Sequence, residues 1–293
     1  MDRIKNGTIK HLALTQLYRW FGVYERPLTT STIRNQMSIL ADDITVTSIS
    51  ELGISQGKKE YEERLHSTER LKVSHFLQEA RVKQLNENSI ELEAEVLHQM
   101  QLPDGTLHSN IFRYESFLTM KQGGLPIINK MRINSLGAIA MDNFEDTYLQ
   151  NRMGSLLHCW QYYMETLKDN IEPLRSLLTS QFEWRLFNGT VMKTWPPLEE
   201  MLIQTDNQVK SSCHFEKNLK IIDRGDNNIT LTVDFDWLCI TLDDKLRSAK
   251  TRHEWQILND PNEPFAHIKK IVVNTVQPVK VIEPIDSNYN YPG

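Results

Sequence analysis

The sequence of 293 residues contains few cysteines and no long apolar run. Its three cysteines, Cys159, Cys213 and Cys239, are too few for a disulfide framework and lack the spacing of a metal site. No apolar stretch approaches the ~18–20 residues that a membrane helix needs. Glycine occurs in no phosphate-cradling loop, because Gly123 and Gly124 stand isolated in a turn. We therefore predict no metal, no cofactor and no membrane partner.

Neither sign of charge dominates the chain. Lysine and arginine number 33 against 38 acidic residues, and the formal net charge is −5 without long runs of one sign. Such a balance provides no basic surface for nucleic acid. The first residues, 1–6, lack the basic-then-apolar pattern of a secretory signal. We expect a cytoplasmic protein with reduced cysteines and no nucleic-acid partner.

The second half of the sequence repeats the first at an offset of 139 residues. Ser74-His75-Phe76 returns as Cys213-His214-Phe215, and the same offset relates Asp104 to Asp243 and Arg113 to Arg252. This offset exceeds the ~20–50-residue period of solenoid repeats and is long enough for a domain. The repeat predicts two tandem domains, over 1–140 and 150–280, followed by a C-terminal tail over 281–293.

Each copy begins with helical periodicity. Apolar residues recur at helical spacing over 12–24 and again over 156–178. Thr30-Ser31-Thr32 supplies N-cap chemistry for a second helix through Leu40, and Pro173 is placed to begin a separate helix. A short strand, over 44–49 and 182–187, and a third helix, over 58–65 and 197–204, follow in the two copies.

Long strands follow the helices. Ile90–His98 and Ile229–Trp237 alternate apolar with polar residues, a period of two that is typical of antiparallel strands with one buried face. Further strands are predicted over 108–121 and 127–134, and over 248–258 and 266–276. Turns are predicted between strands at Pro103-Asp104-Gly105 and Leu242-Asp243-Asp244. Helices followed by an antiparallel meander indicate an α+β fold. The proline-containing segment from Gln277 onward is expected to be poorly ordered.

This order of elements resembles the nuclear-transport-factor-2-like, cystatin-type cone fold, and within it the SnoaL-like branch. Three local features carry the resemblance: an aromatic helix leading into Leu177–Trp184 or Ile39–Val46, the His-Phe pairs at His75 and His214, and the strands with Arg113-Tyr114-Glu115 and Arg252-His253-Glu254. The resemblance implies two cone-shaped domains, each with N-terminal helices on a curved antiparallel sheet and an apolar pocket. Two copies in one chain resemble a fused dimer, as a monomer or in a further homodimer.

Strand alternation predicts which side chains face the interior of each copy. They are Val96, His98 and Tyr114 in the first copy, and Phe235, Trp237, His253 and Trp255 in the second. His98 and His253 are candidate acids or bases inside an apolar cup, and Tyr114 is a candidate donor to a developing oxyanion. For each, a core position with a satisfied polar tip is the simpler alternative.

His75 and His214 recur at the head of a strand, and the resemblance places them at the pocket edge. The apolar phase of Phe76, Ala80 and Val82 instead places His75 on the opposite face, unless a β-bulge shifts the phase. A capping or interface hydrogen bond is then the alternative to a ligand contact.

Aromatic side chains of the helices, among them Tyr18, Phe21 and Tyr163, are expected to line or floor the cones and to contact a flat apolar ligand. Arg113 and Arg252 are each two residues from a glutamate, which predicts salt bridges on an outer strand face.

Two functional hypotheses remain. The first is cofactor-independent acid–base catalysis, by a cyclase, isomerase, dehydratase or hydrolase acting on a polyketide- or terpenoid-like molecule. The second is a noncatalytic pair of ligand-binding or assembly domains. Both imply a small, largely apolar molecule as the partner.

Overall fold

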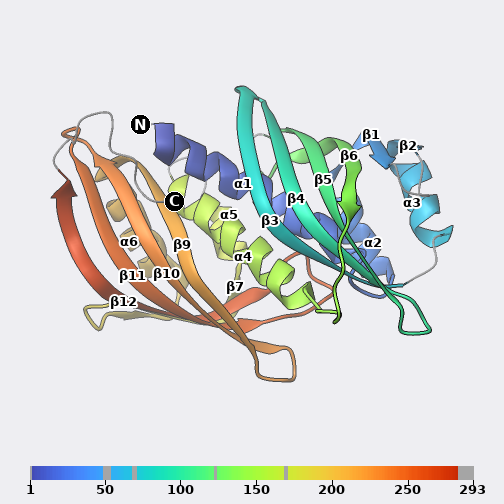
Figure 1. Ribbon diagram of the computed structural model, residues 1–293. Coiled ribbons are helices and arrows are strands. Elements are labelled where there is room, and N and C mark those ends of the chain that lie inside the picture. Colours follow the sequence, from blue (N-terminus) through green and yellow to red (C-terminus); the bar gives the residue numbers. More distant parts are fainter. Residues whose placement is uncertain (1, 49–53, 68–70, 122–123, 168–170, 283–293) are drawn as a thin grey trace. The chain divides into compact units, whose positions relative to one another are not determined.

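A computed structural model describes residues 2–48, 54–67, 71–121, 124–167 and 171–282. Internal contacts divide the chain into two compact units (Figure 1). The N-terminal unit comprises Ile9–Cys159 with Asp260–Ala266. The C-terminal unit comprises the described residues within Met1–Thr8, Trp160–Asn259 and His267–Gly293.

The sheet of the N-terminal unit has six strands in the order β2-β1-β6-β5-β4-β3. Its elements are α1 (Asp2–Gly22, whose first turns belong to the C-terminal unit), α2 (Thr30–Met37), β1 (Leu40–Ser48), β2 (Ile54–Gln56), α3 (Gly57–Ser67), β3 (Lys72–Asn86), β4 (Ser89–Gln101), β5 (Leu107–Thr119) and β6 (Ile127–Ala138). Strands β3 to β6 form an antiparallel meander, and β1 pairs with β6 in parallel.

The C-terminal unit repeats this topology, with the strand order β8-β7-β12-β11-β10-β9. The second copy supplies α4 (Tyr148–Glu165), α5 (Glu172–Ser176), β7 (Leu178–Arg185), β8 (Val191–Met192), α6 (Trp195–Asp206), β9 (Val209–Asp223), β10 (Asn228–Thr241), β11 (Leu246–Leu258) and β12 (His267–Ile282). Here β12 pairs with β7 in parallel.

The predicted α+β class and the two tandem units are confirmed. Figure 1 shows the long strands of both sheets bending and twisting along their length. Each meander is antiparallel as predicted, but the parallel pairings β1–β6 and β7–β12 make both sheets mixed. Alternation along single strands cannot reveal such pairings, because they depend on which strands become neighbours.

Several predicted boundaries were wrong. α1 begins at Asp2 rather than near Leu12, because its polar first turns are held by Ile4, which packs with Cys213 and Ile240 in the C-terminal unit. The segment from Gln277 is not irregular, since β12 continues to Ile282; the remaining tail, 283–293, lies outside the described residues, as does Ile49 of the first short strand.

Other predictions from local chemistry are confirmed in part. The second helix is present, but its N-cap is Thr29, which forms a capping box with Thr32, and it ends at Met37 rather than at Leu40. A proline stands in the first turn of α5, as predicted. The predicted turns at Gly105 and Asp244, which are related by the repeat, both have positive φ. On β4 and β10 the apolar phase is buried, as Leu92, Val96 and Phe235 show.

A bulge in the strand that carries each recurring histidine overturns the phase argument. In the β3–β4 pairing the register shifts between Leu77 and Glu79, and in β9–β10 it shifts opposite Thr232 and Asp234. An extra residue on one strand reverses the faces on either side of it. His75 therefore pairs with His98 and shares the inward face with Ala80, contrary to the simple alternation.

Candidate functional site

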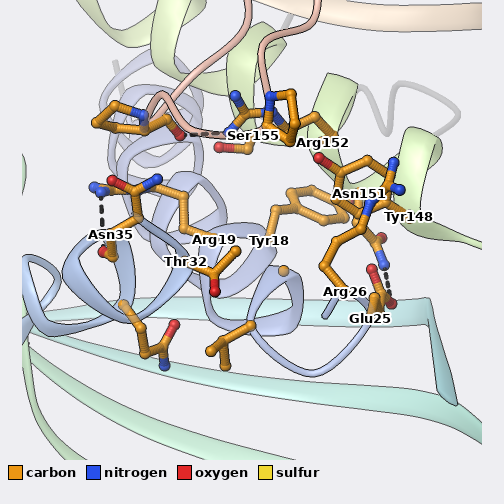
Figure 2. Close-up of a pocket in the computed structure, with 15 residues that line it drawn as sticks. Tyr18, Arg19, Glu25, Arg26, Thr32, Asn35, Tyr148, Asn151, Arg152 and Ser155 are labelled. Carbon is orange, nitrogen blue, oxygen red and sulfur yellow. Dashed lines mark hydrogen bonds between the residues drawn. The ribbon is translucent and has the colours of Figure 1, made fainter. Parts of the chain in front are cut away.

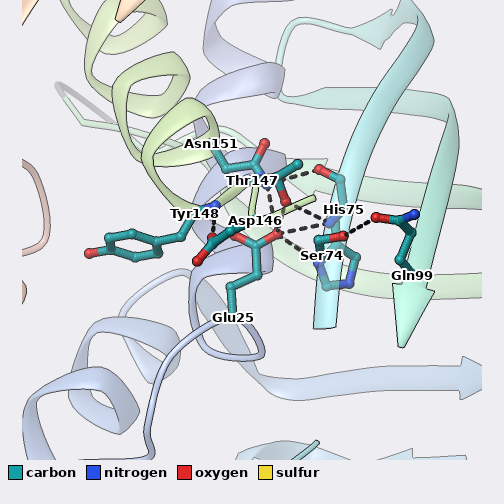
Figure 3. Close-up of polar contacts among 8 residues, drawn as sticks. All are labelled: Glu25, Ser74, His75, Gln99, Asp146, Thr147, Tyr148 and Asn151. Atoms are coloured by element: carbon teal, nitrogen blue, oxygen red, sulfur yellow. Dashed lines mark hydrogen bonds and ion pairs between the residues drawn. The ribbon is translucent and has the colours of Figure 1, made fainter. Parts of the chain in front are cut away.

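A buried carboxyl–imidazole pair lies in the N-terminal unit. Glu25 follows the end of α1, and His75 lies at the head of β3 (Figure 3). Oε1 of Glu25 is 3.0 Å from Nδ1 of His75, and the two side chains are only 1% and 3% exposed. Oε1 also accepts a hydrogen bond from the backbone N–H of His75, at 3.0 Å. The glutamate thereby orients the ring and the strand that carries it.

The start of α4 completes this pair. The hydroxyl of Thr147 donates to Oε1 of Glu25 at 3.0 Å and accepts from the backbone N–H of His75 at 2.9 Å. Nδ2 of Asn151 donates to the same Oε1 at 2.7 Å and to the His75 carbonyl at 2.9 Å. Segments from both copies of the repeat thus build one site within the N-terminal unit.

Burial shifts both members of the pair toward their neutral forms. It raises the pKa of Glu25 to about 8, although hydrogen bonds from Thr147 and Asn151 act in the opposite direction. Burial also lowers the pKa of His75 to about 3. At neutral pH the carboxyl group keeps its proton and the imidazole is uncharged.

Aromatic side chains surround the His75 ring, that of Tyr24 among them at a centroid distance of 6.1 Å. Phe21 stacks on it with a centroid distance of 4.6 Å, His98 meets it edge-on at 5.0 Å, and Tyr114 lies at 6.5 Å. Burial, followed by the neighbouring His75, lowers the pKa of His98 to about 3. Burial raises the pKa of Tyr114, which keeps its hydroxyl protonated. The predicted site residues His98 and Tyr114 therefore lie beside His75, which strand alternation had placed on the opposite face of its strand.

The C-terminal unit contains a related pair. Oε1 of Glu165 accepts from the backbone N–H of His214 at 2.6 Å and lies 3.4 Å from its Nδ1. Thr8, at the repeat position of Thr147, donates to Oε2 of Glu165 at 2.6 Å. Gln161 donates to the His214 carbonyl at 2.8 Å, as Asn151 does to that of His75.

Larger side chains fill the interior of the C-terminal unit. At the repeat positions of Phe21, Val96, His98 and Ser116 it carries Trp160, Phe235, Trp237 and Trp255. Trp160 contacts Phe235 and Trp255 at centroid distances of 5.6 and 5.1 Å, and all three are buried. Trp237 is half-buried opposite His214.

The predicted ligand-contact residues divide between core and cavity. Phe21, Val96 and Tyr163 are buried core residues, whereas Tyr18 is partly exposed and lines a cavity. His253 is buried against Phe235 at 4.8 Å, and burial followed by His214 lowers its pKa to about 3. Arg113 and Arg252 form salt bridges at the surface, as predicted for an outer strand face. Their partners are Glu95 and Asp234 of the neighbouring strand rather than the glutamates two residues away.

Glu25 also lines a cavity of the N-terminal unit (Figure 2). This cavity has a volume of about 50 Å³ and lies between α1, α2, the start of α4 and the segment around Pro261 and Pro264. Glu25 and Asn151 therefore line a cavity as well as belonging to the histidine pair.

Sequence analysis missed Glu25, Thr147 and Asn151. The two glutamates are 140 residues apart rather than 139, so the repeat does not align them. One signal was present: Thr8 and Thr147 obey the 139-residue offset, although both lie outside the strand-rich part of the repeat.

Comparison with solved structures finds neighbours that each match about half of this chain. Hexachlorocyclohexane dehydrochlorinase LinA-type3 of Novosphingobium barchaimii matches 49% of this chain and 95% of its own, with 11% identity and a TM-score of 0.38. A ketosteroid isomerase-like protein of Erwinia carotovora atroseptica matches 45% and 97%, with 13% identity and a TM-score of 0.36. The association domain of CaMKII from C. elegans matches 45% and 98%, with 13% identity and a TM-score of 0.36.

These neighbours belong to the fold group that the sequence resembles, but likenesses this distant carry no argument about activity. No family model and no curated protein matches the sequence. Among the described residues, no helix has the length and apolar character needed to cross a membrane. Function must therefore be inferred from the site itself.

Proposed function

We propose that the N-terminal unit binds a small, largely apolar molecule and transfers a proton on it without a cofactor, as an isomerase or lyase. The observation that carries this proposal is the 3.0 Å contact between Oε1 of Glu25 and Nδ1 of His75, both almost completely buried. A carboxyl group that holds one ring nitrogen sets the tautomer and leaves the other nitrogen for chemistry.

The protonation of Glu25 decides what Nε2 of His75 can do. When Glu25 is ionised, Nδ1–H donates to the carboxylate and Nε2 carries a lone pair, so the imidazole acts as a base. When Glu25 holds its proton, the carboxyl group can donate to Nδ1, and Nε2–H then acts as a donor. Because burial raises the pKa of Glu25 to about 8, we expect the basic form to increase as the pH rises toward that value.

The proposed step is removal of a proton from a carbon next to a carbonyl group. Nε2 of His75 takes the proton, and the electron pair of the C–H bond moves onto the carbonyl oxygen as an enolate. Tyr114, whose hydroxyl remains protonated, donates to that oxygen, and His98 is the second candidate donor. Return of the proton to another carbon gives isomerisation, and loss of a leaving group from the β carbon gives elimination.

The interior of the N-terminal unit favours this assignment over the C-terminal one. The positions of Val96, His98 and Ser116 carry Phe235, Trp237 and Trp255 in the other copy. Since these rings fill the space around His214 and His253, we assign a structural role to the C-terminal unit.

Exchange of carbon-bound hydrogen in D2O tests the proposal. Native protein is incubated with a panel of cyclic ketones such as 2-tetralone, and deuterium incorporation is followed by NMR from pH 6 to 9. We expect exchange that rises with pH, and the His75→Phe variant should lose about 10²–10⁴-fold in rate because an acid–base group is removed.

His214→Phe is the matched control and should keep the native rate. Equal exchange by native protein and His75→Phe would exclude His75 as the base. Binding of the ketones, detected by native mass spectrometry, without any exchange would favour the noncatalytic ligand-binding alternative.

A further inference from the structure

The cavity beside Glu25 is bordered by buried polar atoms that lack hydrogen-bond partners within the described part of the chain. They are Oε2 of Glu25, Nε of Arg26, Oε1 of Gln36 and Oγ of Ser155. The side chain of Glu25 is 1% exposed, and Gln36 and Ser155 are each 2% exposed. Buried polar atoms are nearly always hydrogen-bonded to protein, ligand or water, so four around one cavity indicate a polar occupant.

Other polar side chains of the cavity wall are already engaged. Arg152 donates to the carbonyl oxygens of Asp260, Glu263 and Pro264 at 2.7–2.9 Å and thereby fastens the segment that closes the cavity. Arg19 donates to Ser38 at 2.8 Å. The unsatisfied atoms therefore lie in a wall whose other polar side chains are held by hydrogen bonds within the protein.

The charge of the wall favours an anion. Three guanidinium groups, those of Arg19, Arg26 and Arg152, line the cavity, against the single carboxyl group of Glu25. Because burial raises the pKa of that carboxyl group, it is largely neutral at pH 7 and does not balance the guanidinium charges. Asp260 and Glu263 offset part of the charge of Arg152.

The unsatisfied hydrogen-bonding groups match a carboxylate. Nε–H of Arg26 and the hydroxyl of Ser155 can both donate. Glu25 adds a third donor when its proton lies on Oε2 rather than on the oxygen that faces His75. The amide of Gln36 becomes a donor when its O and N are interchanged, since its present partner, the hydroxyl of Tyr61 at 3.1 Å, can also donate.

The size of the cavity limits the ligand. A volume of about 50 Å³ has room for roughly four water-sized groups, which is the number of non-hydrogen atoms in acetate. Pro261 and Pro264 form part of its wall.

We propose that this cavity is a binding site for a small monocarboxylate, held by Arg26 and Ser155 and by the face of Glu25 that points away from His75. The proposal does not depend on proton transfer at His75. It adds a second ligand site to the N-terminal unit, beside the shared glutamate.

Titration of the full-length protein with sodium acetate at constant ionic strength, followed by saturation-transfer NMR and calorimetry at pH 7, tests the site. Acetamide, which has the same shape without the charge, is the comparison ligand. We expect acetate to bind at least about tenfold more tightly than acetamide, since charge-assisted hydrogen bonds are the stronger ones. Arg26→Gln should weaken acetate binding about tenfold or more, and Ser155→Ala severalfold.

Arg81→Gln removes an exposed arginine and should leave acetate binding unchanged. His75→Phe should also retain it, which separates failure of this site from failure of the proposed function. If Arg26→Gln does not fold, as judged by circular dichroism, Ser155→Ala decides. Native protein that binds no acetate, or binds acetamide equally well, would overturn the proposal, as would equal binding by native protein and the folded variants.

Discussion

The two units share a buried glutamate–histidine pair but differ in what surrounds it. In the N-terminal unit His75 faces His98 and Tyr114, whereas in the C-terminal unit His214 faces Trp237 and Trp160. The backbone positions are related by one repeat, so the difference resides in side-chain size and polarity.

This contrast separates a structural role of the glutamate–histidine pair, common to both units, from a chemical role in the N-terminal unit. In both units the carboxyl group accepts the backbone N–H of the strand that carries the histidine. A threonine also donates to it, Thr147 just before α4 and Thr8 within α1. These contacts fasten a helical segment to a sheet and explain why the pair recurs. In the N-terminal unit two polar groups, His98 and Tyr114, face the histidine ring, whereas in the C-terminal unit Trp237 replaces His98 and His253 replaces Tyr114.

Removal of an aromatic ring from the C-terminal interior should produce the largest effect on stability. Trp255→Ser introduces the residue that the first copy carries at this position, and we expect the free energy of unfolding to fall by about 3–5 kcal/mol because a buried ring is replaced by a cavity. Urea denaturation measures the change, with Phe187→Ala, at a side chain that is 67% exposed, as the control. A change no larger than that of the control would mean that the aromatic cluster does not support this unit.

The pH dependence of stability tests the electrostatics of the Glu25–His75 pair. Folded Glu25 holds its proton to about pH 8 against an ordinary pKa of 4.5, so the folded state binds more protons in that range. Its contribution to the free energy of unfolding is present at low pH and is lost as the pH rises toward 8. The pKa of His75, which burial lowers from 6.5 to about 3, changes the free energy of unfolding in the opposite sense, but only below about pH 6.5.

Between pH 6.5 and 8, therefore, Glu25 is the member of the pair that makes the free energy of unfolding depend on pH. Over this window the native protein should lose up to about 2 kcal/mol relative to Glu25→Gln, at about 1.4 kcal/mol per pH unit. Urea denaturation at several pH values compares the two proteins. Parallel pH profiles would show that Glu25 is ionised throughout and that its pKa is not raised.

The smallest expected effect concerns the threonines that complete each pair. Thr147→Val and Thr8→Val each remove one hydrogen bond to a buried carboxyl group, and we expect each to cost about 1 kcal/mol in thermal or urea unfolding. The exposed Thr275→Val on β12 provides a control for the substitution. If only one of the two buried changes destabilises the protein, the two threonines do not serve equivalent roles.

Local patterns predicted much of the fold but little of the site. Alternation on β4, β5, β10 and β11 placed Val96, Tyr114, Phe235 and Trp255 inside, because side chains of a regular strand alternate whatever the strand pairs with. The same reasoning failed for His75, because a bulge interrupts the alternation without a composition signal that identifies it. Glu25 was missed because it follows a helix and lies 50 residues from its partner.

The sequence by itself determined the duplication, the order of helices and strands, the buried phase of the long strands and the turn positions. These properties arise from residues that are neighbours in the chain or on one element, so their period and spacing reveal them. Tertiary structure alone decided that Glu25, His75 and Thr147 meet, since bonds across 50 and 72 residues depend on how helices dock against the sheet. It also decided which histidine faces inward, because a single extra residue in β3 exchanges the two faces of the strand.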